Sequence, residues 1–585
     1  MPQLNFSVKL ELSPCFLMLL FITSCDSHLP IAKTNRPPTS GAVQKIDSAG
    51  QIQLQGILGT GLDPDLRWPD FTPYKMDLED FYQGPEPHLA WAKNNQPTSQ
   101  ALTYIKIFQQ AGEKGLDPED YDASRWGARL SALNNNSADG TLVKFDEALT
   151  ITLMRYARAL NVGRLNPNNP GPAINLAGAP FPLAAFLHDK LENAADPATV
   201  IKTLEPPWPG YWRMLDALHS VTRMTQQDSG ELLPVPRRPL SPGQTYPSIP
   251  RLAALLTLIG DLPSGAIVDP QSSLYAGSLV DAVKQYQLRH GLTQDGKLTA
   301  AVVNDLNVPL NHRVEQAALA LERWRWLPHS FAEPPVIVNV PEFKVRAYDA
   351  TGHLTLFKSV IVGKAYGHKT PLFENEIKYV VFRPYWEVPP SIQRSEIVPH
   401  MQRDHTYFSR IKLEAVAPDG TALTSGSMTP AVLAGLRSGH YHVRQMPGTG
   451  NSLGLVKIIF PNSDNIYLHG TDAPHLFSLS RRDLSHGCIR VEDPADLVAW
   501  ILRNNAGWDI QRVKAAMHGD RDNVRVNLTK TIPVLILYST VATDEDGHTY
   551  FLDDIYGFDA TLEAALAKGY PYRTATHITS TVPPR

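Results

Sequence analysis

The segment Ser485-His486-Gly487-Cys488 brings a hydroxyl, an imidazole, a glycine and a thiol together within four residues. A thiol attacks a carbonyl carbon well only as the thiolate, so a nucleophilic cysteine requires a base or positive surroundings. A histidine can take the thiol proton and later return it to a leaving amine. Glycine lets a carbonyl group approach the backbone closely, and the N–H groups of Gly487 and Cys488 are candidates for stabilising an oxyanion. The segment therefore predicts acyl transfer through Cys488.

Two histidines are candidates for the base. His486 lies two residues before Cys488, and the two side chains share a face if the segment is extended. His469 ends a strand-like run sixteen positions before Ser485, with Gly470 directly after it, and folding can bring it to the thiol. The spacing alone leaves both histidines open.

Other chemistry at this segment is less well supported. Arg490, two residues after Cys488, is expected to steady the segment, with contact to a substrate as the alternative. A small buried apolar role is the alternative for Cys488, but its polar and glycine neighbours argue against it. Binding of zinc is the alternative role for these histidines and Cys488, but the chain has no C-x-x-C or H-E-x-x-H motif. We assign His440 and His442 to a lid and expect no metal ion and no cofactor.

The composition favours a globular chain of several domains. At about 150 residues per domain, 585 residues indicate three or four domains. Hydrophobic residues make up 43% of the chain and charged residues 19%, which argues against a coiled coil or a largely disordered chain. The formal net charge of -4 gives no field that attracts phosphate backbones, so we expect no nucleic-acid partner.

The N-terminal residues indicate export. Residues 16–22 form an apolar run that is too short to span a bilayer but is typical of a secretory signal. We predict a signal sequence at residues 1–25, with a buried hydrophobic helix as the alternative. Residues 22–25 resemble a bacterial lipobox, and Asp26 resembles the inner-membrane retention signal of Gram-negative lipoproteins. We therefore expect a periplasmic protein whose one membrane contact is a lipid on Cys25.

The first half of the chain is predicted to be helical. We expect a linker at residues 26–60, a helical scaffold domain at 61–232 and a proline-rich linker at 233–250. Residues 251–312 form a compact three-helix unit that resembles the small peptidoglycan-binding domain found beside many bacterial wall enzymes. A helical spacer without affinity for glycan is the alternative. Its helices are expected at 251–259, at 279–290 and from 299 onward.

The last third of the chain is predicted to be mainly β, which gives a multidomain α+β fold. We expect a catalytic domain at 313–545, in which a helix through residue 326 precedes the strands, and an insertion within it at about 401–445. A C-terminal tail at 546–585 is expected to pack against the sheet, and we assign it no chemistry. Loops as long as this insertion are usually lids or binding elements. The strand-like runs, rich in β-branched and aromatic residues, lie at 336–340, 356–362, 377–382, 455–460, 465–468 and 532–538.

These features together resemble one known family. The string from His469 through Ser485-His486-Gly487-Cys488 matches the signature of the L,D-transpeptidases. In that family the upstream histidine is the general base, which implies this role for His469 and a supporting role for His486. The layout is similar to that of the larger Gram-negative members, and the insertion resembles their substrate-capping subdomain. Further positions that carry the resemblance are Val362-Gly363, Thr370-Pro371, Pro447-Gly448, Asn451, Gly454 and Phe460-Pro461-Asn462.

The resemblance implies a reaction and its partners. Cys488 would attack the carbonyl that precedes the terminal D-Ala of a peptidoglycan tetrapeptide stem. The amine of diaminopimelate on a neighbouring stem would then complete a cross-link between two diaminopimelate residues. Family members are typically acylated by carbapenems at this thiol. The implied partners are peptidoglycan stem peptides, with wall-synthesis proteins as further candidates.

The resemblance also implies supporting residues. The oxyanion or supporting set is Ser485, His486, Gly487, Gly470 and Arg490. We add Tyr385, Trp386 and Asn451 as candidate substrate contacts, with packing as the alternative for the two aromatic residues.

Three other functions remain open at this stage. An L,D-carboxypeptidase or hydrolase would use the same thiol to trim stems without joining them. A transferase that anchors proteins to the wall would differ only in its acceptor. A wall-binding structural lipoprotein would have no enzymatic activity at all.

Overall fold

The structure is a computed structural model and describes residues 44–83, 87–135, 139–165, 181–269, 271–404, 406–423 and 429–570. The predicted signal sequence, the Cys25 anchor and the end of the predicted tail lie outside these residues. Among the helices of the described ranges, none combines the length and the apolar character needed to traverse a bilayer.

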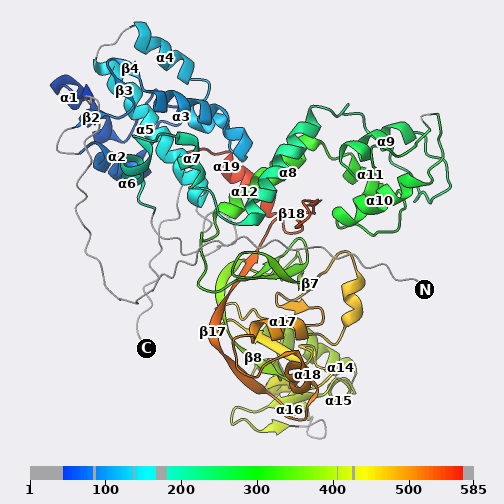
Figure 1. Cartoon of the computed structure of the whole chain (residues 1–585). Coiled ribbons are helices and arrows are strands. Elements are labelled where there is room, and N and C mark those ends of the chain that lie inside the picture. Colours follow the sequence, from blue (N-terminus) through cyan, green and yellow to red (C-terminus); the bar gives the residue numbers. More distant parts are fainter. Residues whose placement is uncertain are drawn as a thin grey trace, which may run out of the picture. The chain divides into compact units, whose positions relative to one another are not determined.

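A helical domain forms the first part of the described chain (Figure 1). Its longest helix, α5 (Asp139–Val162), buries Leu149, Leu153, Tyr156 and Leu160, as their helical spacing predicts. Aromatic rings pack around this helix and fill the core. The other elements are β1 (Gln44–Lys45), α1 (Ser48–Thr60), η1 (Thr72–Tyr74), α2 (Lys75–Tyr82), β2 (His88–Leu89), β3 (Ala92–Lys93), β4 (Gln96–Pro97), α3 (Ser99–Gln109), η2 (Ala111–Lys114), η3 (Pro118–Tyr121), α4 (Trp126–Asn135), α6 (Leu183–Phe186), η4 (Leu187–Leu191), α7 (Pro197–Lys202) and α8 (Pro209–Thr225).

The predicted linker at residues 26–60 is wrong in its second half. Helix α1 occupies much of it and is capped by the Asp47 carboxylate, which accepts a hydrogen bond from the Gly50 N–H. Leu54 and Leu58, four residues apart, enter the core of the helical domain. Burying each such side chain contributes about 1.5–3 kcal/mol, which stabilises this segment as a helix.

The three-helix unit forms as expected, from α9 (Ile249–Leu258), α10 (Ser278–Arg289) and α11 (Ala300–Leu306). The proline-rich segment at 233–250 is part of this unit, contrary to the expectation of a free linker. Leu233 and Tyr246 are buried in the core of the unit, and Leu240 forms an isolated β-bridge with Leu298. Proline fixes the backbone of this segment, while its scattered apolar side chains supply the packing.

Helix α12 (Leu310–Arg325) is the helix expected before the strands, but it packs with the helical part of the chain, so the predicted domain boundary at residue 313 is too early. Its Ala317, Ala320 and Leu321 pack against Tyr211 and Leu218 of α8. The alternation of apolar residues typical of strands begins only after this helix, at Val336.

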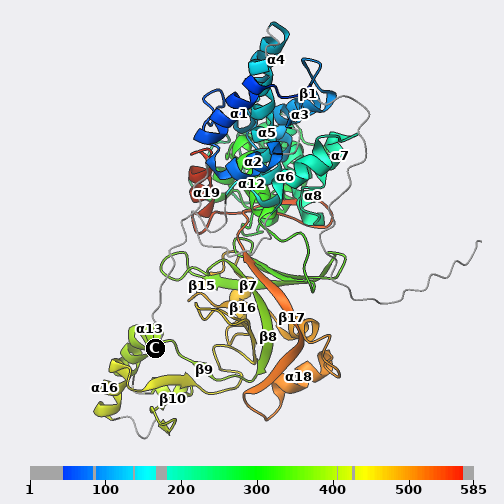
Figure 2. The same ribbon diagram turned by 90° about the vertical axis from the view of Figure 1, so that its left-hand side faces the viewer.

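A nine-stranded sheet forms the β domain. Its order is β15-β7-β16-β14-β13-β8-β17-β5-β6, and β6 also pairs with β7, so the sheet closes on itself. β8 and β17 run side by side as long curved strands (Figure 2). The strands are β5 (Val336–Asn339), β6 (Lys344–Tyr348), β7 (Leu354–Gly363), β8 (Phe373–Phe382), β13 (Val456–Ile459), β14 (Leu468–His469), β15 (Asp483–Ser485), β16 (Ile489–Val491) and β17 (Val524–Leu537).

Two helices, α17 (Ala495–Ile501) and α18 (Ile510–His518), pack on this sheet. The turn η7 (Pro474–Ser478) lies in the connection from β14 to β15. After β17 the chain forms the hairpin β18 (Val541–Thr543) and β19 (Thr549–Phe551) and then helix α19 (Phe558–Leu566). The predicted boundary at 545/546 therefore cuts a hairpin. In the described part of the tail, Tyr556 is buried in the core of the β domain.

The insertion is a subdomain with its own sheet and its own core, and it begins earlier than the predicted residue 401. Val388 and Val443 lie side by side at its base, where the Val388 N–H donates to the Val443 carbonyl at 2.9 Å. Both are buried in a separate apolar cluster. Its elements are β9 (Trp386–Glu387), α13 (Pro390–Ile392), η5 (Gln393–Ile397), α14 (Val398–Arg403), α15 (Tyr407–Arg410), β10 (Leu413–Val416), β11 (Ala422–Leu423), α16 (Pro430–Ser438) and β12 (His442–Gln445).

Candidate active site

Cys488 lies immediately before strand β16, where the β domain pairs β16 with β14 in parallel. In this register His469 lies opposite Arg490, and Leu468 lies opposite Ile489. Side chains alternate across a strand, so Tyr467, His469, Cys488 and Arg490 share one face of the sheet. The fold thus brings together residues about twenty positions apart in the sequence.

The thiol contacts the strand beside it. Cys488 Sγ donates to the carbonyl of Asn465 at 3.5 Å, and the backbone and phenol of Tyr467 also hydrogen-bond to the sulfur. Lys457, from β13, places its ammonium 4.0 Å from the centre of the Tyr467 ring. The sulfur therefore lies in a half-buried setting with polar and cationic neighbours, unlike a cysteine that packs only as an apolar residue.

Opposing effects act on the thiol proton. Burial raises the pKa of the Cys488 thiol, while the hydrogen bonds from Tyr467 and the charges of Lys457 and Arg490 oppose that rise. The net pKa lies above the ordinary value, so the resting group is a protonated thiol. Attack on a carbonyl then needs a base that removes the proton as the bond to sulfur forms.

His469 is suited to accept that proton. Its side chain is buried, and burial, with the nearby positive charge of Arg490, lowers its pKa to about 3. The imidazole is therefore neutral at physiological pH, and its Nδ1 makes no hydrogen bond to a described residue. The His469 ring packs edge-on against the Tyr467 ring, with centroids 5.7 Å apart. In the described residues no hydrogen bond joins the imidazole to the sulfur in this state.

Ser485 closes the turn that carries the thiol. Its Oγ donates to the Cys488 carbonyl at 2.6 Å and accepts from the Gly487 N–H at 3.1 Å. The Gly487 N–H is therefore occupied, which argues against its expected role as an oxyanion donor. The Cys488 N–H makes no hydrogen bond with another described residue and is the donor that remains. Ser485 fits the supporting role.

His486 points to the insertion rather than to the thiol. Its Nε2 lies 2.5 Å from a carboxylate oxygen of Glu396 in η5, and its ring packs against that of His368. The motif histidine thus connects the thiol-bearing turn to the inserted subdomain. Of the two histidines that the sequence left open, only His469 shares a sheet face with the thiol.

Gly470 and Arg490, which were also predicted for the site, have different surroundings. Gly470 donates its N–H to the Val456 carbonyl at 3.0 Å and so holds the end of β14. Arg490 is half-buried, its Nε makes no hydrogen bond to a described residue, and its charge acts on both the thiol and His469. This places Arg490 beside the reacting groups rather than in the turn it was expected to steady.

The predicted substrate contacts lie at the junction with the insertion. Asn451 is buried, and its Nδ2 donates to the carbonyls of Pro384, Gln445 and Met446, which gives it a structural role in place of the expected substrate contact. Tyr385 is half-buried beneath the Arg444 guanidinium, 4.4 Å from its ring centre.

Trp386 packs partly on the core of the insertion and pairs with Gln445 in β12. The described contacts of Tyr385 and Trp386 support the packing alternative, and none of them involves Cys488. His442 bonds to Glu387 within the insertion, in keeping with its assignment to the lid.

Sequence reasoning missed Tyr467, Lys457 and Glu396. Tyr467 could have been found, because it lies two residues before His469 in an extended run and must share its face. Lys457 and Glu396 come from other elements, and no spacing in the sequence connects them with Cys488.

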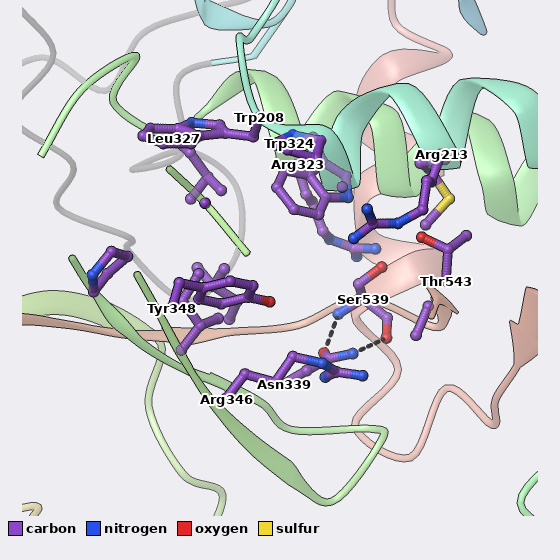
Figure 3. Close-up of a pocket in the computed structure, with 18 of the residues that line it drawn as sticks. Trp208, Arg213, Arg323, Trp324, Leu327, Asn339, Arg346, Tyr348, Ser539 and Thr543 are labelled. Atoms are coloured by element: carbon purple, nitrogen blue, oxygen red, sulfur yellow. Dashed lines mark hydrogen bonds between the residues drawn. The ribbon is translucent and has the colours of Figure 1, made fainter. Parts of the chain in front are cut away.

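A separate cavity of about 210 Å³ lies between α8, α12 and strands β5 and β6 (Figure 3). The indoles of Trp208 and Trp324 and the Arg213 guanidinium line it. On one side the Asn339 side-chain amide donates to the Ser539 carbonyl and accepts from the Ser539 N–H. The cavity includes none of the predicted site residues, so we assign it no part in thiol chemistry.

Comparison with known families agrees with this division of the chain. Residues 76–218 match a family model described as a scaffold domain. Residues 251–306 match one described as "Putative peptidoglycan binding domain". Residues 334–529 match the L,D-transpeptidase catalytic domain.

Two individual proteins were also compared. A Haemophilus influenzae protein described as "Putative L,D-transpeptidase" is 31% identical over 251 residues, which are 43% of this chain and 49% of that protein. The match thus spans about half the length of this relative. A crystal structure of an L,D-transpeptidase from Xylanimonas cellulosilytica covers 52% of this chain and 100% of its own, with 14% identity and a TM-score of 0.16, too low to support an argument. Residues 334–529 of this chain therefore form a domain of the L,D-transpeptidase catalytic family.

Proposed function

We propose that this protein is a peptidoglycan L,D-transpeptidase that forms diaminopimelate–diaminopimelate cross-links through a thioester on Cys488. The observation that carries the proposal is the group of side chains on one sheet face: the Cys488 thiol, on which the charges of Lys457 and Arg490 act, and a neutral, buried His469. The matched catalytic domain and the peptidoglycan-binding unit support stem peptides as the substrate class.

The first half-reaction breaks one amide bond. The thiol rotates from the Asn465 carbonyl toward His469, which takes the proton while sulfur bonds to the carbonyl carbon before the terminal D-Ala. The Cys488 N–H stabilises the oxyanion. When the intermediate collapses, the C–N bond breaks, His469 protonates the departing amine, and D-Ala leaves. The acyl group remains on sulfur as a thioester.

The second half-reaction returns the enzyme to its resting state. The amine of diaminopimelate on a neighbouring stem attacks the thioester carbon, and His469 takes its proton. Sulfur departs and recovers that proton, so one amide is broken and one is made. Because the thioester conserves the free energy of the broken amide, the reaction needs no ATP outside the cytoplasm.

The insertion favours transfer over hydrolysis. Its Glu396 bonds to His486 in the turn that carries the thiol, so the subdomain is joined to the site by a direct contact. A lid that excludes water protects a thioester until an amine arrives. Trimming of stems and anchoring of proteins use the same first half-reaction and are the competing outcomes.

The location of the protein follows as a further proposal. A lipid on Cys25 would hold the chain at the periplasmic face of the inner membrane, where the stems are accessible. Cell fractionation of wild type and Cys25→Ala tests this: the variant should leave the membrane fraction, and retention there would contradict the anchor.

Product analysis tests the reaction. The full chain is incubated with purified tetrapeptide-containing muropeptides, and the products are identified by mass. We expect a joined dimer that has lost one D-Ala, and no dimer with Cys488→Ala. Tripeptide as the main product would identify a carboxypeptidase, and unchanged substrate with both proteins would favour a structural wall-binding protein.

A further inference from the structure

The C-terminal segment contributes a buried side chain to the β domain. Tyr556 lies between β19 and α19, outside the part of the chain that matches the catalytic-domain model, and only 4% of it is exposed. Its phenol donates to the Gly363 carbonyl at 2.5 Å and accepts from the Thr370 N–H at 3.1 Å. One hydroxyl thus joins the end of β7 to the loop that follows it.

Thr370 extends this contact to the turn that carries the thiol. Its side chain is fully buried, and its Oγ1 accepts from the Gly363 N–H at 2.9 Å. The same Oγ1 donates to the carbonyl of Gly487 at 2.7 Å. Gly487 directly precedes Cys488. A continuous path of three hydrogen-bonded groups therefore runs from Tyr556 to the residue before the nucleophile.

The close packing of β7, the loop after it and the turn with Cys488 requires glycine at two positions, Gly363 and Gly487. A Cβ on Gly363 would lie 1.9 Å from a backbone carbonyl oxygen, so only glycine admits the crossing of the loop at this place. Gly487 has φ of +119°, in the region that favours glycine. Two glycines and a buried threonine therefore fix the spacing between β7 and the turn.

Tyr556 is itself held in place. Its N–H donates to the Tyr538 hydroxyl at 2.9 Å, and Lys369 Nζ donates to its carbonyl at 2.7 Å. The Asp554 carboxylate accepts from the N–H groups of Phe558 and Asp559 at the start of α19. Because Tyr538 directly follows β17 and Lys369 lies in the loop after β7, Tyr556 is held by two separate segments, and its phenol has little freedom to move away from Gly363.

We propose that Tyr556 is a positioning residue for Cys488 and acts through Thr370 and Gly487. The inference rests on the proposed function of Cys488. Loss of the phenol oxygen leaves the Gly363 carbonyl and the Thr370 N–H buried without a partner, and the backbone shifts to satisfy them. The shift reaches the Gly487 carbonyl and changes where the sulfur and the Cys488 N–H lie. Displacements of this kind far from the reacting atoms lower catalysis more than substrate binding.

Single-atom variants test the path in the full chain. Tyr556→Phe and Thr370→Val each remove one hydroxyl, Thr370→Ser retains it, and Tyr550→Phe is the matched control. Tyr550 lies in the same C-terminal segment and donates to Asp544 at 3.0 Å, away from the turn. The readouts are kcat and KM on a tetrapeptide stem, the rate of Cys488 alkylation by iodoacetamide followed by peptide mapping, and the melting temperature.

We expect Tyr556→Phe and Thr370→Val to lower kcat about 10- to 100-fold with KM changed by less than about 2-fold. The alkylation rate of Cys488 should change in both variants. Thr370→Ser should recover most of the activity lost in Thr370→Val, and Tyr550→Phe should behave as wild type.

Wild-type kcat and alkylation rate in Tyr556→Phe would overturn the proposal, as would equal losses in Tyr550→Phe. If Tyr556→Phe does not fold, the comparison of Thr370→Val with Thr370→Ser decides: equal losses in both would refute the path. Full activity in Cys488→Ala would instead refute the proposed function, while the alkylation data would still report on positioning.

Discussion

The pH profile of acylation tests the ionisation state of the site. Burial and the charge of Arg490 lower the pKa of His469 from 6.5 to about 3. A histidine with this pKa is about 99% neutral at both pH 5 and pH 7. With an ordinary pKa, it would be about 76% neutral at pH 7 and about 3% at pH 5, and a reaction that needs the neutral ring would slow about 25-fold. We expect a change below about 2-fold over this range.

The pH profile also distinguishes two ways in which the Cys488 thiol could lose its proton. Burial raises the pKa of Cys488, so the group stays protonated at neutral pH. If attack needed a thiolate formed beforehand, the rate would rise about tenfold per pH unit. If His469 removes the proton during attack, the rate stays flat because both resting groups keep their protonation state.

The assay is the rate of acylation of Cys488 by a carbapenem that does not titrate in the range, followed by intact mass from about pH 5 to about pH 8. The folded pKa of His469 lies below the unfolded value, so its contribution to stability is complete above about pH 6.5 and is lost as pH falls toward 3. Circular dichroism at each pH must therefore confirm the fold.

Arg490→Met extends the test. It removes the cation that lowers the pKa of His469, so the acid side of the profile should move to higher pH. Arg525→Met, which removes an exposed arginine stacked on Tyr379, should keep the wild-type profile. A change of slope near pH 6.5 in the wild-type rate profile would refute the low pKa of His469. A rise of about tenfold in the rate per pH unit would refute attack by a thiol that is protonated at rest.

Three further perturbations follow from the structure. Gly363→Ala places a Cβ 1.9 Å from a backbone carbonyl oxygen, so it should lower the free energy of unfolding by urea by about 2 kcal/mol or more and remove most of the activity. The control Gly450→Ala, whose Cβ meets nothing within 4 Å, should lower it little. Equal stabilities of the two variants would contradict the packing. Replacing residues 389–442 by a short linker should raise the ratio of hydrolysed to cross-linked product on a defined tetrapeptide, and an unchanged ratio would refute the lid. Glu396→Gln should raise that ratio less, because the partly exposed pair with His486 contributes about 1 kcal/mol or less, and a lower ratio would contradict the link.

Much of the fold could be predicted from the periodicity of the sequence. The strand-like runs at 336–340 and 377–382 became β5 and β8. Helix α1 was missed because its apolar residues do not form one regular helical face: Ile52 is exposed, and Leu54 and Leu58 are buried only through tertiary packing. Proline content likewise signalled a linker at 233–250 where buried Leu233 and Tyr246 hold the segment in place.

The candidate site could also be predicted only in part from the sequence. Cys488 and His469 were identified from residue chemistry and family resemblance, and the register of β14 and β16 places them on one face. Residue type alone could not tell that Asn451 uses its amide on backbone carbonyls. The path from Tyr556 was also out of reach, because it depends on how distant segments cross.

The most direct test of the central claim is the mass of the acyl-enzyme. The full chain is mixed with a tetrapeptide donor in the absence of an acceptor amine, quenched in acid, and analysed as intact protein and by peptide mapping. We predict an added mass equal to the donor less D-Ala, carried by the peptide that contains Cys488 and absent from Cys488→Ala. An adduct on any other residue, or the same adduct in Cys488→Ala, would contradict the account.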